Sequence, residues 1–82
     1  MNIDTLNNLS LGETAIILDN NVKGKNKRHL TNLGLSSNNK IKCLFKSPFN
    51  DPVAYEIKNV IIAIREEDSK NILIYRGNYG TN

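Results

Sequence analysis

The fold of this chain is decided by Leu30-Thr31-Asn32-Leu33-Gly34-Leu35, a stretch that predicts the end of a short helix. Gly34 follows the helix at the position where a left-handed conformation is needed, and glycine has no Cβ to clash there. Leu30 and Leu35 are then the apolar pair that closes a Schellman ending. Further along the chain, Ile62-Ala63-Ile64-Arg65-Glu66-Glu67-Asp68 predicts a buried strand that runs into a charged turn. These two segments, with two prolines between them, anchor the order of the remaining elements.

Alternation of apolar and polar residues predicts five short strands around these segments. Residues 40–46 alternate cleanly, so that Ile41, Cys43 and Phe45 point inward and Leu44 is an exception on the lysine-rich outer face. Residues 60–65 are almost continuously apolar, as expected for a strand buried on both faces. The other elements are expected as strands at 13–19, 53–57 and 72–75, a helix at 27–33 with Asn26 as its N-cap, and a helical turn at 66–71. This pattern indicates a mainly β fold, a small SH3-like barrel with one or two short helices.

Two turns are expected between the strands. Residues 47–52 contain both prolines, which lack backbone donors, and an Asn-Asp pair that suits a tight bend. Lys58 and Asn59 form a two-residue hairpin connection, in which asparagine can adopt positive φ. Arg65, which ends the next strand, is expected to reach Asp68 or Glu67, or to cap the carbonyl groups of the turn that follows.

Length and composition limit the class of protein. The chain has 82 residues and a single cysteine. A domain of this size buries only about 60% of its unfolded surface, so a deep enzyme cleft is not expected. No apolar run approaches the roughly 20 residues of a membrane-spanning helix, and the first residues do not have the pattern of a secretory signal. We therefore expect a cytoplasmic protein with one domain over residues 1–76 and a flexible tail over residues 77–82.

Four short motifs occur in an order that is known from one protein family. They are Leu9-x-x-Gly12-Glu13-x-Ala15, Arg28-His29-Leu30-x-x-Leu33-Gly34-Leu35, Pro48-x-x-Asp51-Pro52 and Ala63-Ile64-Arg65-x-Glu67-Asp68. In this order the chain resembles the FeoA family, the small cytoplasmic accessory component of bacterial ferrous iron uptake. The resemblance implies an SH3-like barrel that works beside FeoB, a membrane permease with a cytoplasmic GTPase domain. Asn38 and Asn59 stand where the family commonly has glycine, and asparagine is the residue that next best tolerates positive φ.

Neither catalysis nor a resident metal is predicted. No nucleophile stands at a recognisable spacing from a base and a carboxylate, and no glycine-rich phosphate loop is present. A transition-metal site needs several converging ligands, whereas His29 and Cys43 lie on different elements. Cys43 is expected in the core, where a lone thiol behaves as a small apolar group. Asp51 and the carboxylates at 66–68 could hold a hydrated cation only weakly. We therefore expect no enzyme activity and no cofactor.

The expected function lies in a surface. Basic residues gather around the start of the predicted helix, namely Lys23, Lys25, Lys27, Arg28 and His29. Positive charge at a helix start is unfavourable by roughly 0.3–1 kcal/mol per residue, so this placement suits docking to an acidic patch or an anionic membrane. A solvated loop is the alternative. Leu35, Leu44 and Phe49 are candidates for an exposed apolar patch, unless Leu35 closes the helix end and Phe49 covers the mouth of the barrel.

The resemblance and this surface together predict an interaction module. The predicted partner is a FeoB-type ferrous iron permease, contacted through its GTPase domain or its membrane part, and the membrane is reached only through that partner. The predicted partner-binding residues are Lys27, Arg28, Leu35, Leu44 and Phe49. The alternative is a stand-alone SH3-like regulatory domain that acts with a metal-dependent transcriptional repressor. The net charge of +3 does not indicate nucleic acid binding, because no aromatic residues interleave with the lysines. Free edge strands leave room for a weak homo-oligomer.

Overall fold

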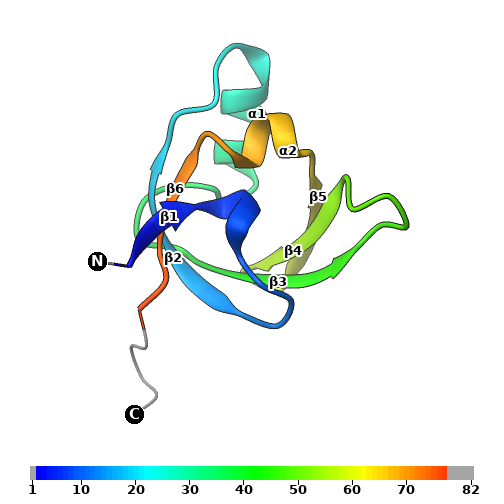
Figure 1. Ribbon diagram of the computed structural model, residues 1–82. Coiled ribbons are helices and arrows are strands. Elements are labelled where there is room, and N and C mark those ends of the chain that lie inside the picture. The colour runs from blue at the N-terminus through cyan, green and yellow to red at the C-terminus, as the bar shows by residue number, and fades with distance from the viewer. Residues whose placement is uncertain (1, 78–82) are drawn as a thin grey trace.

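Six antiparallel strands form one curled sheet in the computed structural model, which describes residues 2–77 (Figure 1). The strands are β1 (Ile3–Thr5), β2 (Thr14–Asn20), β3 (Lys40–Lys46), β4 (Val53–Ile57), β5 (Val60–Ile64) and β6 (Ile72–Tyr75). The helical segments are η1 (Leu6–Asn8, a 3-10 turn), α1 (Lys25–Asn32) and α2 (Glu66–Ser69). The strand order is β1-β6-β2-β3-β4-β5, so that β1 and β5 are the free edges. The predicted mainly β class with short helices is confirmed, with β1 as an additional strand.

The core lies on the inner side of the curled sheet, where apolar side chains from alternating strand positions meet. Its fully buried members include Leu6, Ile17, Leu35, Ile41, Tyr55, Ile57, Ile72 and Ile74. Cys43 is also fully buried, as predicted, and burial raises the pKa of its thiol. None of the helices within residues 2–77 is both long and apolar enough to cross a membrane.

Helix α1 ends in the predicted Schellman motif. The Leu35 N–H donates to the Leu30 carbonyl and the Gly34 N–H donates to the Thr31 carbonyl, both at 3.0 Å. Gly34 has a φ of 112°, in the region that glycine tolerates best. The side chains of Leu30 and Leu35 are both buried, which seals the helix end against the sheet. The local sequence therefore predicted this part of the fold correctly.

The beginning of α1 differs from the prediction. The helix starts at Lys25, and the N-cap is Gly24 with a φ of 73° and no side-chain cap. Asn26 therefore lies inside the helix, and its predicted role as N-cap is wrong. Its side-chain amide instead donates to Asp68 Oδ2 of α2 at 3.3 Å. Gly24 adopts its positive φ without a Cβ clash, and the helix begins directly after it, two residues before the predicted start at Lys27.

A β-bulge in β3 reverses the predicted facing of Phe45. Cys43 pairs with Tyr55 and Phe45 pairs with Ala54, so Leu44 is an extra residue without an opposite partner. As a result Phe45 lies on the outer face of the sheet and is 58% exposed, while Leu44 is half-buried. The prediction that Phe45 points inward was wrong, because a period of two cannot anticipate an inserted residue.

The β4–β5 hairpin confirms the predicted turn but not the predicted burial of β5. Lys58 and Asn59 connect the strands with φ values of 52° and 67°, the pattern of a type I′ turn. Asn38 also has positive φ, at 74°, as expected where glycine is replaced. β5 is an edge strand whose outer face is uncovered, and Ile61 is 62% exposed. Only the inward side of the strand is buried, because antiparallel sheets are commonly covered on one face.

Arg76 ties the two ends of the described chain together. Its guanidinium donates to Asp4 Oδ2 at 2.8 Å and to both carboxylate oxygens of Glu13 at 2.9 and 3.0 Å. The hydrogen bonds from Arg76 hold the pKa of Glu13 below its ordinary value. The pKa of Asp4 is lowered first by the Asn8 amide, then by the Thr5 N–H and Arg76. Of the tail predicted at 77–82, only Gly77 belongs to the described residues, and it is buried.

We expect the Arg76→Met variant to lose about 1 kcal/mol of unfolding free energy at neutral pH and to lose less on acidification than the parent. Both carboxyl groups have folded pKa values below their ordinary 3.8 and 4.5, so their contribution is complete above those values. This contribution to the unfolding free energy disappears as the pH falls through the lowered pKa values of the folded state. Urea unfolding at about pH 7 and about pH 3 measures this difference. Lys40→Met is the control, and an equal acid loss in parent and Arg76→Met would contradict the assignment.

Candidate docking surface

Helix α2 lies between the start of α1 and the β3–β4 loop, and polar contacts join both segments to it. Asn26 of α1 donates to Asp68, as described above. From the loop, Asp51 Oδ1 accepts the backbone N–H of Glu66 at 2.9 Å, which satisfies one of the free donors at the start of α2. In Figure 1 the two helices lie at the top and the loop at the right. We call the α1 start, α2 and the β3–β4 loop (residues 47–52) together the α2 surface.

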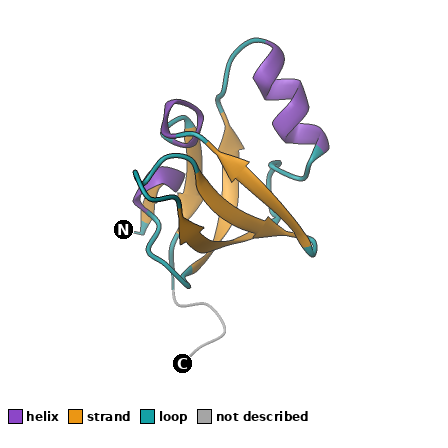
Figure 2. Cartoon of the chain, turned by 90° about the vertical axis from the view of Figure 1, so that its right-hand side faces the viewer, coloured by secondary structure: helices purple, strands orange, loops and turns teal. Residues whose placement is uncertain are grey.

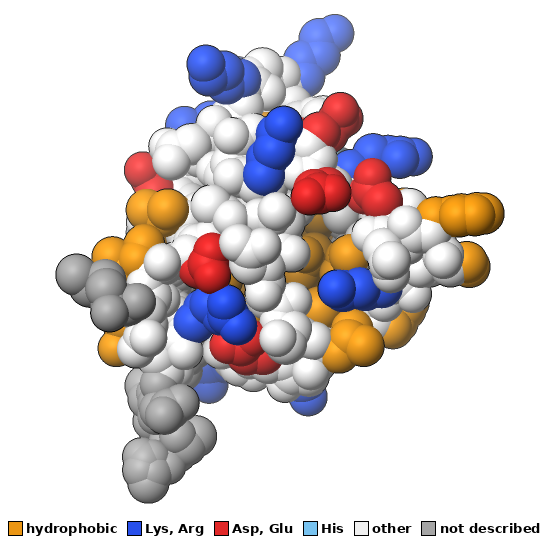
Figure 3. Space-filling view, viewed as in Figure 1, with side chains coloured by type: hydrophobic (Ala, Val, Ile, Leu, Met, Phe, Trp, Pro, Cys, Tyr) orange, Lys and Arg blue, Asp and Glu red, His pale blue; other side chains and the backbone are white. Residues whose placement is uncertain are grey.

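The β3–β4 loop presents Phe49 to solvent. Three hydrogen bonds brace the loop: Asn50 N–H to the Ser47 carbonyl (2.8 Å), Asp51 N–H to Ser47 Oγ (2.9 Å) and Ser47 N–H to the Pro52 carbonyl (3.2 Å). The side chain of Phe49 is 89% exposed. It therefore does not cover the mouth of the barrel, which was the alternative considered from the sequence. Figure 3 shows hydrophobic atoms protruding over this loop.

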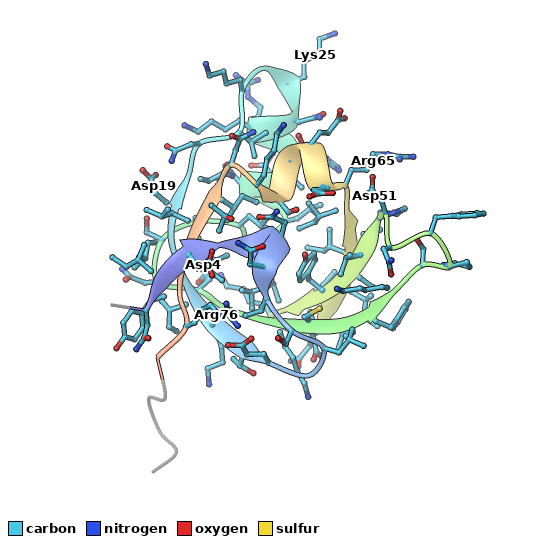
Figure 4. All side chains as sticks on the ribbon, viewed as in Figure 1. Asp4, Asp19, Lys25, Asp51, Arg65 and Arg76 are labelled. Atoms are coloured by element: carbon cyan, nitrogen blue, oxygen red, sulfur yellow. The ribbon has the colours of Figure 1, made fainter. Side chains whose placement is uncertain are left out.

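The start of α1 carries unneutralised positive charge. Lys25, Lys27 and Arg28 are exposed, and the first turn contains no acidic residue. None of the three forms an ion pair with another described residue. Lys25 points away from the body of the protein (Figure 4), and α1 stands at one end of the sheet (Figure 2). These cations are therefore available to an acidic partner, at the cost to helix stability that their position implies.

Arg65 meets the acidic turn of α2 through its backbone and not through its side chain. Arg65 is the N-cap of α2, and its carbonyl accepts the N–H groups of Asp68 and Ser69 at 3.0 and 2.9 Å. Its exposed guanidinium makes no ion pair and donates to no carbonyl group within the described residues, so neither the predicted pairing with Asp68 or Glu67 nor the predicted capping of the turn is seen. Arg65 and Asp51 lie on the same side of the molecule (Figure 4). The α2 surface thus places basic, acidic and apolar groups next to one another.

Two of the five predicted partner-binding residues are not fully at the surface. Leu35 is completely buried beneath the end of α1, which is the alternative considered for it from the sequence, so a partner cannot contact its side chain in this structure. Leu44 is only half-buried, and the neighbouring Phe45 is the more exposed of the two. Lys27, Arg28 and Phe49 are exposed as expected. No signal in the sequence identified Phe45, because its exposure depends on the bulge in β3.

A small cavity of about 190 Å³ lies beneath the β3–β4 loop. It is lined by Asn7, Lys46, Asn50, Val53, Tyr55, Glu66 and Ser69. The Tyr55 hydroxyl donates to the Leu6 carbonyl at 3.5 Å, and burial raises the pKa of Tyr55 to about 12, so it is neutral at physiological pH. Within residues 2–77 no three His, Cys, Asp or Glu side chains converge on a point that could hold a metal ion.

Comparison with known proteins identifies the fold. The family model for the FeoA domain matches residues 5–76. No curated protein matches the sequence. The solution structure of FeoA from Chlorobium tepidum is 23% identical, covers 95% of this chain and 73% of its own, and superposes with a TM-score of 0.85. Iron(II) transport protein A from Clostridium thermocellum is 25% identical, covers 88% of this chain and 44% of its own, and has a TM-score of 0.82. Stenotrophomonas maltophilia FeoA complexed with zinc, a prokaryotic SH3 domain protein, is 22% identical, covers 85% of this chain and 87% of its own, and has a TM-score of 0.74.

Proposed function

Because this chain belongs to the FeoA family, which is associated with ferrous iron transport, we propose that it binds a FeoB-type GTPase permease and modulates it. The observation that carries this proposal is the exposure of Phe49 on a loop braced by hydrogen bonds. Burying one such side chain contributes about 1.5–3 kcal/mol, and a braced loop loses little conformational freedom on binding. Aromatic residues of this kind are frequent energetic centres of protein interfaces.

The charges around Phe49 support a protein partner with a mixed surface. Lys27 and Arg28 suit an acidic patch on the GTPase domain, whereas Glu66 and Glu67 of α2 suit a basic one. Charges of both signs beside one apolar anchor fix the orientation of a partner better than a uniformly charged surface does. Phe45, two residues before the loop, extends the apolar part of the contact. The cytoplasmic GTPase domain of the permease is therefore the part we propose to be bound.

We expect the Phe49→Ser variant to bind the GTPase domain about tenfold more weakly than the parent, equivalent to about 1.4 kcal/mol. The measurement is an amide-resonance titration of labelled protein with that domain, taken from the same genome, with and without nucleotide. Shifts should cluster at Lys27, Arg28, Phe45 and Phe49. Leu11→Ser removes an apolar side chain of 59% exposure outside the α2 surface and should leave the affinity unchanged.

Two results would contradict the proposal. The first is equal affinity of the parent and Phe49→Ser, which would place the contact elsewhere. The second is an unchanged spectrum at high concentrations of the GTPase domain. If a metal-dependent repressor from the same genome shifted the resonances and the GTPase domain did not, the regulatory alternative would take the place of this proposal.

A further inference from the structure

The outer edge of β5 has backbone groups that are free to pair. Ile57 and Val60 flank the two-residue turn, so the N–H of each donates to the C=O of the other. Along the strands from there, hydrogen-bonded pairs alternate with pairs that are not hydrogen-bonded. Tyr55 and Ile62 are again a hydrogen-bonded pair, which leaves the N–H and C=O of Ile61 and Ala63 pointing away from β4. β5 pairs with no other strand in the described chain. The edge therefore offers an alternating row of donors and acceptors.

The side chains of β5 do not protect this edge. Natural edge strands are commonly blunted by charged residues, proline, a bulge or short length. β5 has the sequence Val60-Ile61-Ile62-Ala63-Ile64, without charge or proline, and its register with β4 is unbroken. The other edge strand, β1, is three residues long and contains Asp4, which is paired with Arg76. Only β5 is long, apolar and regular.

One row of side chains on the outer face is apolar up to this edge, although Glu56 lies opposite Ile61 in the neighbouring row. Phe45, Ala54 and Ala63 are cross-strand neighbours on β3, β4 and β5, and they form one row that ends at the edge. Phe45 is 58% and Ile61 62% exposed, and Ala63 is exposed as well. A strand added to β5 would cover this row from the side.

We propose that β5 pairs antiparallel with β5 of a second copy of this chain, in a register centred on Ile62. Twofold symmetry then sets Ile61 opposite Ala63 of the second copy, and Ala63 opposite its Ile61. These are the residues whose backbone groups point outward, so each pair can exchange both hydrogen bonds. The row Phe45, Ala54, Ala63 continues into Ile61 of the second copy, and the two sheets become one. A register shifted by one residue would set side chains of the inner face opposite side chains of the outer face.

Charge complementarity favours a second copy as the occupant of this edge. Counted on past the ends of the strand, the same register sets Lys58, in the hairpin turn, opposite Glu66, the first residue of α2, in the second copy, and we propose that their side chains pair there. Lys58 is exposed and forms no ion pair within the described chain, and the carboxylate of Glu66 is bonded only to the Asn7 amide, at 3.4 Å. Because a single strand edge buries much less than the roughly 1,200 Å² of stable interfaces, the dimer is weak and forms at high concentration.

Analytical ultracentrifugation of the full chain from about 20 µM to about 2 mM tests this proposal, since weak interfaces dissociate in that range. The parent should shift from monomer to dimer, and Ile61→Lys should weaken the dimer at least tenfold, because it sets a charge opposite Ala63 of the second copy in the middle of the apolar row. Leu11→Lys introduces the same charge at a site of similar exposure, 59%, and should dimerise like the parent. In a mixture of isotope-labelled and unlabelled chains, intermolecular contacts should join Ile61 to Ala63.

A charge exchange tests the register and the identity of the occupant. Lys58→Glu and Glu66→Lys should each weaken the dimer, and the double variant should recover the parent's affinity. A parent that stays monomeric throughout would overturn the proposal, as would a dimer insensitive to Ile61→Lys or a double variant that does not recover. If the parent is monomeric and the Ile61 and Ala63 amides shift only when the GTPase domain is added, the edge accepts a strand of another protein and the proposal is wrong.

Discussion

The Gly34→Ala variant is expected to lose about 3 kcal/mol of unfolding free energy, the sum of a backbone cost of 1–2 kcal/mol and an overpacking cost of about 1–3 kcal/mol. Gly34 has a φ of 112°, where a residue with a Cβ is strained. A Cβ at this position would also lie 2.8 Å from Cγ2 of Ile57, whose side chain is buried and cannot move aside freely. Because small domains have total stabilities near the lower end of 5–15 kcal/mol, this loss would leave the domain close to unfolding.

Urea unfolding measures this loss, and two further variants separate its causes. Gly12→Ala also places a Cβ at positive φ, 80°, but nothing lies within 4 Å of it, so only the backbone cost of about 1 kcal/mol is expected. Ile57→Leu removes the Cγ2 methyl, and in that background Gly34→Ala should cost less than it does in the parent. Equal losses for Gly34→Ala and Gly12→Ala would show that the close packing against Ile57 is not a source of instability.

The Asn20→Leu variant is expected to lose about 2–3 kcal/mol, because it leaves buried polar groups without partners. Asn20 is 6% exposed at the end of β2. Its Oδ1 accepts the Val22 N–H at 3.0 Å, and its Nδ2 donates to the Leu35 carbonyl at 3.1 Å and to Thr31 Oγ1 at 3.4 Å. The side chain therefore holds the end of α1 against the sheet, and leucine of similar size replaces none of these bonds.

The neighbouring asparagine provides the control for this variant. Asn21 is exposed, and Asn21→Leu is expected to change the unfolding free energy by no more than about 0.5 kcal/mol. Asn20→Asp keeps an acceptor for Val22 but sets a carboxylate against the Leu35 carbonyl, so it should also destabilise the domain at neutral pH. If Asn20→Leu were as stable as Asn21→Leu, the hydrogen bonds of Asn20 would have no net role in stability.

Part of the docking surface could be predicted from the sequence because its exposure follows from local polarity. Lys27 and Arg28 occupy a polar helix in which only Leu30 is buried, and Phe49 lies in a proline-bounded turn. Leu35 is buried because the Schellman ending turns its side chain inward, which was one of two alternatives considered. The hydrogen bonds that join α1 and the β3–β4 loop to α2 connect residues far apart in the chain, so no local pattern could anticipate them.

The sequence by itself determined the features that depend on neighbouring residues: the glycine-closed end of α1, the Lys58-Asn59 turn, the burial of Cys43 and the mainly β class. These follow from backbone conformation and alternation within a few positions. Only the tertiary structure decided that β5 is an edge strand, that a bulge turns Phe45 outward, and that Arg76 rather than Arg65 forms the ion pairs among residues 2–77. Each of these depends on which segments become neighbours in the sheet, and residues separated by much of the chain meet only when it closes.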